Sequence, residues 1–256
     1  GDAAISLGWE AQYVLYKPTA NADNWILLDT SRAFAHQSYG PLTPNSSAAE
    51  TISAVNYAYP TANGFTVVSG TYNSAPYIYL AIRRGPMAQP TSGTQVYTPV
   101  AYTGTRQANA ILTSGFPTDS IWTRFRTLVV SMNVGDRLRG SYPLLTSATD
   151  AENTGSDRFG FDIMTGVVSK ADQTGASSYS FTDHHFRRYP GVFDEVCYTG
   201  TGANHFEAHN LGAVPELIIT KNRTGAPTVT GWVTAAPSVF AGPGFIAFLN
   251  TTATPF

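Results

Sequence analysis

Three polar residues near the end of the sequence have the types and spacing of metal ligands. His205, Glu207 and His209 alternate along the chain, so on a β-strand their side chains would share one face. Two imidazoles and a carboxylate can hold zinc. However, no fourth ligand is evident, and a polar strand that faces solvent has the same alternation. The pattern favours the solvent-facing strand, and we expect neither a metal nor a cofactor.

A second cluster places a carboxylate beside two imidazoles, as general acid–base catalysis requires. In Asp183-His184-His185, neighbouring side chains would point to opposite faces of a strand, so only Asp183 and His185 could act together. The same alternation separates Asp194 from Glu195. No Gly-x-Ser-x-Gly motif is present. The sequence therefore predicts no enzyme, although a glycosidase pair could still form from carboxylates that are distant in sequence.

Glycines and aromatic residues offer two further binding modes. Gly200, Gly202 and Gly212 lack the Lys-Ser/Thr ending and the following helix of a phosphate-binding loop, so we interpret them as turns. Exposed tryptophans and tyrosines could stack on sugar rings, whereas in β proteins such residues more often pack in cores and interfaces. Sugar binding therefore stays open as a second interpretation. The tryptophans are Trp9, Trp25, Trp122 and Trp232.

The segments that must position these residues are predicted to be short β-strands. Runs rich in β-branched and aromatic residues, bounded by Gly, Pro or Asn, occur at 12–16, 65–68 and 77–82. Helical periodicity is scarce, and one short helix is expected around 48–52, where Asn45-Ser46-Ser47 could cap it. Short strands without long helices between them predict an antiparallel sandwich or barrel.

Composition narrows the class of partner. Only 12% of the 256 residues are charged, and the formal charge of −2 provides no positive field for nucleic acid. No apolar run approaches the length of a bilayer span, and the first residues lack the features of a signal peptide. We expect neither a nucleic-acid partner nor membrane insertion. The single cysteine, Cys197, has no partner for an intrachain disulfide and lacks the context of a nucleophile, so it is predicted to pack as a small apolar residue.

The sequence also repeats itself with a period close to 100 residues. Three pairs of segments lie 102 residues apart: Ala49-Glu50 with Ala151-Glu152, Gly64 with Gly166, and Tyr77-Ile78-Tyr79 with Tyr179-Ser180-Phe181. Two more pairs drift, as loop insertions would cause: Arg83-Arg84 with Arg187-Arg188 at 104, and Asp29-Thr30-Ser31-Arg32 with Asp136-Arg137-Leu138-Arg139 at 107. Self-similarity at a fixed period is typical of a repeated architecture. Chance similarity between Thr/Ser/Gly-rich segments is the alternative, which the shared spacing disfavours.

The end of the sequence matches earlier segments as well. The matches are 196–201 with 100–105, 214–221 with 10–17, and 249–253 with 44–48. We therefore expect three β units, at 1–95, 96–193 and 194–256, of which the first lacks its start and the third its end.

Several of these segments resemble a repeat of virion structural and fibre-like proteins of marine bacteriophages. The segments are His209–Arg223, Gly231-Trp232, Leu249–Ala253, Tyr77–Pro86 and Tyr189–Gly202. They cover most of both ends of the chain, whereas residues 116–180 depart from the family pattern. The resemblance implies repeated β-sandwich units on a phage particle and brings no catalytic residues. The expected fold class is thus all-β, with repeated antiparallel, jelly-roll-like β-sandwich units and little helix.

The resemblance implies a bacteriophage virion structural protein on the particle surface, a tail-fibre, spike or other appendage component with a host-adsorption role. Expected partners are other copies of the chain, other virion proteins and a host surface glycan. A trimer is favoured, because phage appendages are commonly symmetric and a weakly charged, tyrosine-rich surface favours self-association. A glycan-binding receptor module is the alternative. A polysaccharide-degrading enzyme is less favoured, because acids are scarce.

The expected unit boundaries have a consequence for the strand edges. If the first unit lacks its start and the third its end, each contains strands whose neighbours in the unit are missing. Open edges expose backbone N–H and C=O groups and invite aggregation, so a stable protein should cover them. We therefore expect residues 194–256 to contact residues 1–85, or a neighbouring chain, through main-chain strand pairing.

Overall fold

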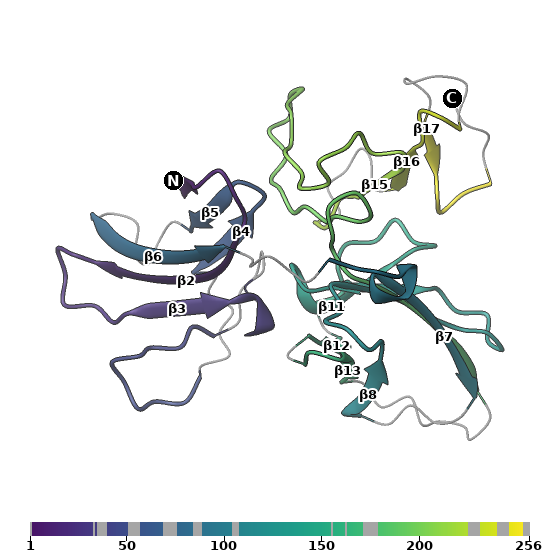
Figure 1. Ribbon diagram of the computed structural model, residues 1–256, viewed down its shortest axis with the longest axis horizontal. Coiled ribbons are helices and arrows are strands. Elements are labelled where there is room, and N and C mark those ends of the chain that lie inside the picture. Colours follow the sequence, from purple (N-terminus) through teal and green to yellow (C-terminus); the bar gives the residue numbers. More distant parts are fainter. Residues whose placement is uncertain are drawn as a thin grey trace.

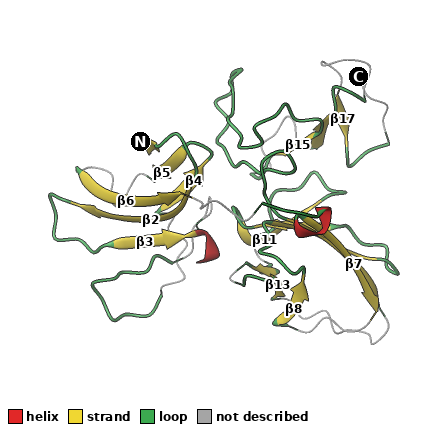
Figure 2. Cartoon of the chain, viewed as in Figure 1, coloured by secondary structure: helices red, strands yellow, loops and turns green. Residues whose placement is uncertain are grey.

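In the computed structural model the described residues are 2–32, 34, 40–50, 57–68, 76–83, 89–103, 108–154, 156–161, 163–170, 179–224, 231–239 and 246–252. These residues form β-strands and two single 3₁₀ turns, and every strand pair is antiparallel (Figures 1 and 2). The all-β prediction is therefore confirmed, while the jelly-roll connectivity stays a prediction. No helix within the described ranges is long and apolar enough to cross a membrane.

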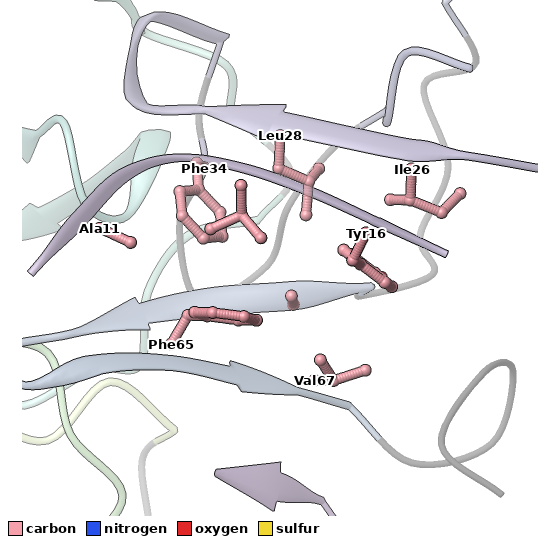
Figure 3. Packing of buried hydrophobic residues seen from close by; sticks show 9 residues of the cluster. Ala11, Tyr16, Ile26, Leu28, Phe34, Phe65 and Val67 are labelled. Carbon is pink, nitrogen blue, oxygen red and sulfur yellow. The ribbon is translucent and has the colours of Figure 1, made fainter. Parts of the chain in front are cut away.

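The first part of the chain folds into two facing sheets, which we call the N-terminal sheet pair. Its elements are β1 (Ala3–Ser6), β2 (Ala11–Pro18), β3 (Ile26–Asp29), the 3₁₀ turn η1 (Thr30–Arg32), β4 (Ala58–Thr61), β5 (Gly64–Val67) and β6 (Tyr77–Arg83). One sheet has the order β3-β2-β6 and the other β1-β5-β4. Tyr16 of β2 lies with Phe65 and Val67 of β5 in one buried cluster (Figure 3). Val14 of β2 belongs to the same cluster, so the alternation along β2 produces this core.

The middle of the chain builds a second arrangement of this kind, the middle sheet pair. Its elements are η2 (Gly93–Gln95), β7 (Tyr97–Thr103), β8 (Ala110–Thr113), β9 (Ser120–Phe125), β10 (Asn133–Asp136), β11 (Gly140–Leu145), β12 (Phe159–Gly160), β13 (Gly166–Ser169) and β14 (Ser180–Phe186). The larger sheet has the order β11-β10-β9-β14-β7 and the smaller one β12-β13-β8. Leu112, Ile121, Phe159, Phe161 and Val167 form the buried cluster between them.

The strands of the two sheet pairs match in register. Tyr13 lies opposite Asp29 in the first pair, and Ser120 opposite Asp136 in the second, each residue 107 positions later. Likewise, Ser6 lies opposite Gly64, and Thr113 opposite Gly166. Tyr16 faces Tyr79 as Thr123 faces Asp183. By register, β2 therefore corresponds to β9, β3 to β10, β5 to β13 and β6 to β14. Tyr79 matches Asp183, a shift of 104 (183 − 79), so the match of Tyr77-Ile78-Tyr79 with Tyr179-Ser180-Phe181 at 102 was wrong by two residues.

A third, smaller sheet lies at the C-terminal end of the chain. It contains β15 (Ile218–Lys221), β16 (Trp232–Ala235) and β17 (Ile246–Phe248) in that order. The N–H of Trp232 donates to Asn250 Oδ1 at 2.9 Å, just as the N–H of Trp25 donates to Asn45 Oδ1 at 3.0 Å. The first bond joins β16 to the turn after β17, and the second joins the start of β3 to the segment around Asn45. Because the two bonds match, β16 corresponds to β3, and β15 corresponds to β2.

The C-terminal sheet packs on the middle sheet pair. Trp232 is buried against Val134 and Leu144, its ring lies 6.1 Å from that of Trp122, and its Nε1 donates to the Leu145 carbonyl at 2.8 Å. Within the described part of one chain, no strand of this sheet pairs with residues 1–85. The expected pairing within the chain is therefore absent there, and pairing with a neighbouring chain stays a prediction. The unit boundaries 1–95, 96–193 and 194–256 stay predictions as well.

The helix expected around 48–52 is absent from its described part, since residues 48–50 are not helical, and residues 51 and 52 lie outside the described residues. Of the proposed cap, Ser46 Oγ accepts from the Ala48 N–H at 3.1 Å, whereas the Asn45 side chain has other partners. Asn45 Oδ1 accepts from Trp25, and its Nδ2 donates to Asn24 at 2.8 Å. The Asn45 side chain thus fastens a strand instead of starting a helix.

Gly64 and Gly166, the first residues of β5 and β13, occupy matching positions where the backbone of a neighbouring strand comes close. A methyl group added to Gly64 would overlap the carbonyl oxygen of Ile5, and one added to Gly166 the carbonyl oxygen of Leu112. Because backbone cannot yield easily, Gly64→Ala and Gly166→Ala should each lower the free energy of unfolding by roughly 1–3 kcal/mol. Urea denaturation measures this. Gly93→Ala, where a methyl group meets nothing, should change little, and equal effects at all three glycines would contradict the close approach.

Candidate functional site

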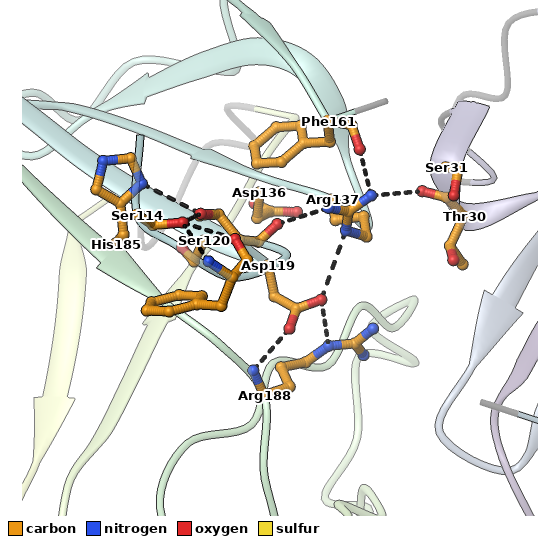
Figure 4. A network of polar contacts seen from close by, with 12 residues as sticks. Thr30, Ser31, Ser114, Asp119, Ser120, Asp136, Arg137, Phe161, His185 and Arg188 are labelled. Atoms are coloured by element: carbon orange, nitrogen blue, oxygen red, sulfur yellow. Dashed lines mark hydrogen bonds and ion pairs between the residues drawn. The ribbon is translucent and has the colours of Figure 1, made fainter. Parts of the chain in front are cut away.

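Charged side chains gather in the interior where the two sheet pairs and the C-terminal sheet meet. The chain has few charges, yet eight Asp, Glu and Arg residues are less than a tenth exposed, and all of them except Asp183 belong to one network of seven. Asp119 precedes β9, Asp136 ends β10, and Arg188 follows β14, so the network surrounds the ends of the central strands (Figure 4). The seven are Glu10, Asp119, Asp136, Arg137, Arg139, Glu152 and Arg188.

One branch of this network links the middle sheet pair to the N-terminal one. Arg188 donates from its backbone N–H to Asp119 Oδ2 at 2.7 Å, and from Nη1 to both carboxylate oxygens of Glu10 at 2.8 and 2.7 Å. Arg137 donates to the carbonyls of Phe161, Thr118 and Thr30, and its Nε lies 3.6 Å from Asp119. Charge-assisted bonds therefore tie two sheet pairs that are far apart in sequence.

A second branch links the middle sheet pair to the C-terminal sheet. Arg139 binds Asp136 and donates from Nη1 to Glu152 Oε1 at 2.8 Å. The other oxygen of Glu152 accepts from Arg223 Nη2 at 2.6 Å, and the Glu152 N–H donates to the Arg223 carbonyl at 2.8 Å. Glu152 thus binds Arg139 of the middle sheet pair and Arg223, which follows β15 of the C-terminal sheet.

The N-terminal sheet pair contains the same arrangement in a more exposed setting. Arg32 binds Asp29 through Nε at 2.8 Å, Glu50 through Nη1 at 3.2 Å and the Leu27 carbonyl through Nη2 at 3.5 Å. Arg139 has the matching partners Asp136, Glu152 and the carbonyl of Val134. The aspartate of each motif also accepts the backbone N–H of its arginine, which closes the turn after the strand.

These pairs have a structural role. Burial opposes the charge of Arg139 and Arg188, but the neighbouring carboxylates outweigh burial and raise the pKa of both guanidinium groups above its ordinary value. A group that stays charged and has its partners in place has no proton to exchange with a substrate. Such pairs specify how elements fit together more than they add stability.

Glu195 differs from the carboxyl groups of this network in its hydrogen bonding. Its Oε2 is buried and has no hydrogen-bond partner in the described part of the chain. Burial, together with Asp136, raises the pKa of Glu195 well above its ordinary value, although Arg139 and Arg188 act in the opposite direction. Folding therefore shifts Glu195 toward the neutral acid relative to the unfolded chain. Burial likewise raises the pKa of the Cys197 thiol, which keeps it an unreactive neutral group.

The two residues of the acid–base cluster share the buried face of β14, as the alternation predicts. Asp183 accepts from Thr123, and His185 Nδ1 lies 3.2 Å from the Thr118 hydroxyl. His184 points the other way and binds the hydroxyl of Tyr97 at 2.8 Å. Asp183 and His185 are buried in the core, where a substrate cannot reach them.

The three metal candidates do not share a strand face, because residues 201–217 form no strand. His205 Nε2 lies 3.1 Å from Glu207 Oε1, while His209 Nδ1 accepts from the N–H of Leu211 at 3.2 Å. The assumption of a strand was therefore wrong for this segment. No group of three or more potential ligands is placed around a metal position among the residues that the structure describes.

Sugar binding would need exposed aromatic rings beside a hollow. Trp232 is buried, and the other three tryptophans are half-buried. A shallow depression of about 290 Å³ beside η2 has one aromatic residue, Tyr189, in its lining. The rest of that lining is Gln89, Pro90, Thr91, Ser92, Gly93, Val96 and Val192. It contains no carboxylate, and so neither the stacking platform nor the acid pair of a glycosidase lies there.

The repeated motif allows a matched test of the network. Glu152 and Arg139 have side chains 4% and 5% exposed, whereas Glu50, the matching residue beside Arg32, is 39% exposed. Glu152→Gln should lower the free energy of unfolding by about 3–5 kcal/mol, because it removes the buried carboxylate charge that Arg139 and Arg223 share. Glu50→Gln should cost about 1 kcal/mol or less. Denaturant unfolding compares them, and equal losses would contradict a joining role for Glu152.

Glu195 predicts a dependence of stability on pH. Since its pKa is raised in the folded state, its contribution is complete below the ordinary carboxyl pKa and is lost as pH rises through the raised value. Glu195→Gln cannot ionise, so the difference between wild-type and variant stability should change with pH in this direction. Denaturation at a series of pH values measures that difference. The exposed Glu216→Gln is the control, and parallel curves for wild type and Glu195→Gln would refute the prediction.

Comparisons with known proteins concern the N-terminal sheet pair. Residues 2–86 match the model of a domain of unknown function, DUF7483, and this range contains all six strands of that sheet pair. No curated protein matches the chain, and no solved structure does. The N-terminal sheet pair is thus similar to a domain family whose function is unknown.

Proposed function

We propose that the chain is a bacteriophage virion structural protein, a component of a tail fibre, spike or other appendage on the particle surface with a host-adsorption role. The observation that carries the proposal is the repeated plan: β2-β3 and β9-β10 share one register, and the Asp-x-x-Arg motif recurs with its glutamate. Repetition of one unit is how extended assemblies gain length. The resemblance of the chain's end segments to phage fibre-like repeats gives this architecture its biological context.

The distribution of charge supports a structural role over catalysis. The buried acids of the network bind arginines inside the molecule, and two of them, Glu10 and Glu152, join separate parts of the chain. A hydrolase would instead present paired carboxylates in a cleft. A polysaccharide-degrading enzyme is therefore the least favoured function.

Self-association is the second part of the proposal, with a trimer favoured and with other virion proteins as further partners. β6 exposes an aliphatic row, Ile78, Leu80 and Ile82, on a sheet whose charged residues are few. Apolar surface of this kind typically becomes buried in an interface. In this assembly the units are jelly-roll-like β-sandwiches.

A glycan-binding receptor module is the second candidate. The specific observation in its favour is that Tyr97 and Tyr198 are exposed, each more than a third, so part of each ring is accessible to a sugar of the host surface. Host adsorption and glycan binding are compatible, since an appendage can carry a receptor-binding face.

Labelling of intact particles tests the proposed role. Antibodies raised against the purified chain should place gold on an appendage of the phage that encodes it, as seen by electron microscopy. Light scattering of the purified chain should give the mass of three chains. Particles without label, beside a chain found only in the soluble fraction of the lysate, would contradict the proposal. Antibodies against the phage's major coat protein provide the positive control.

A further inference from the structure

The strand β6 has one edge that no described strand fills. It pairs with β2 in the order β3-β2-β6. Its counterpart β14 lies between β9 and β7, and seven residue pairs join β14 to β7. In the middle sheet pair, β7 thus occupies the edge of β14 that corresponds to the open edge of β6.

The side chains of β6 agree with a missing neighbour. Ile78, Leu80 and Ile82 point to one face and are 54%, 52% and 52% exposed. On β14 the matching residues Thr182, His184 and Phe186 are half-buried. Tyr97 of β7 covers part of this face, since its ring lies 5.0 Å from that of Phe186.

The C-terminal sheet also has an open edge. β15 pairs with β16 in the order β15-β16-β17, and no described strand fills its other edge. β15 corresponds to β2, whose matching edge is filled by β6. Leu217 and Ile218 at this edge are 57% and 44% exposed. The free edge of β6 is the one that β7 occupies on β14, and the free edge of β15 is the one that β6 occupies on β2. Each end of the chain therefore offers one strand edge with exposed aliphatic side chains.

We propose that the β6 edge of one copy pairs with the β15 edge of a second copy, so that β3-β2-β6 and the neighbour's β15-β16-β17 form one continuous antiparallel sheet. This inference rests on the proposed structural role and names the surface through which copies assemble. Main-chain bonds close both edges, and the row of Ile78, Leu80 and Ile82 packs beside Ile218 of the next copy.

The contact joins two different surfaces, so each copy keeps one free edge for the next. Heterologous contacts of this kind give a closed ring when the rotation between copies closes and a filament when it does not. A ring of three agrees with the favoured trimer. Nothing in the buried network has to move, because β6 and β15 both lie outside it.

A complementation experiment tests the contact. A lysine on an edge strand blocks edge-to-edge pairing, so Leu80→Lys should close the β6 edge and Ile218→Lys the β15 edge. Each variant alone should be monomeric by light scattering at concentrations where the wild type assembles. An equimolar mixture should give the mass of two chains, because one partner still offers β15 and the other still offers β6. Ile111→Lys on β8, another exposed isoleucine in an edge strand, should assemble as the wild type does.

The outcomes separate the contact from its alternatives. Assembly of either lysine variant would overturn the proposal, as would a monomeric wild type or a monomeric mixture. Loss of assembly from Leu80→Lys alone would point to pairing of β6 with its own copy and would overturn it too. Hydrogen exchange of the wild type gives a second readout that needs no variant, since the amides of both edges should become protected on concentration. If labelling finds the chain on an appendage while the lysine variants assemble normally, the contact fails and the role stands.

Discussion

Burying charge in a protein with so few charged residues is the constraint on which the rest of the structure depends. An arginine in the interior must keep its charge and must find acceptors there, or the fold loses several kcal/mol, about 3–5 for a broken buried pair. Arg188 finds them on Glu10 and Asp119, and Arg139 on Asp136 and Glu152. Glu10 belongs to the N-terminal sheet pair, and Glu152 also binds Arg223 beside the C-terminal sheet, so satisfying the arginines fixes how these parts of the chain meet.

The apolar contacts follow from that arrangement. Each sheet pair has its own core, which alternating side chains produce without help from the network. The smallest sheet, by contrast, cannot build a core alone, and it covers the outer face of β9, β10 and β11 through Trp232. Glu152 and Arg223 lie beside this contact and orient it. The ionic and apolar contacts therefore select the same arrangement, while the β6 edge at one end and the β15 edge at the other stay outside it.

Sequence reasoning found the local features and missed the network. Alternation placed Asp183 and His185 on one face, and the echo of Asp29–Arg32 in Asp136–Arg139 proved to be one repeated turn with identical partners. Glu10 and Arg188 are 178 positions apart, and no local spacing shows that they meet. A usable signal was present, since arginines concentrate at 137–139 and 187–188 in a chain that is otherwise poor in charge. The prediction that His205, Glu207 and His209 share one face was wrong, because alternation places side chains on one face only in a strand. Their segment is irregular.

The central claim is that one repeated β plan, locked inside each chain by buried arginines, is completed between chains at its two open edges. An experimental density map of the purified assembly tests it most directly. The account predicts one sheet running from β3-β2-β6 of one copy into β15-β16-β17 of the next, with the Glu10–Arg188 and Glu152–Arg223 pairs intact in each copy. Copies that meet through other surfaces, with the β6 edge left in solvent, would contradict it.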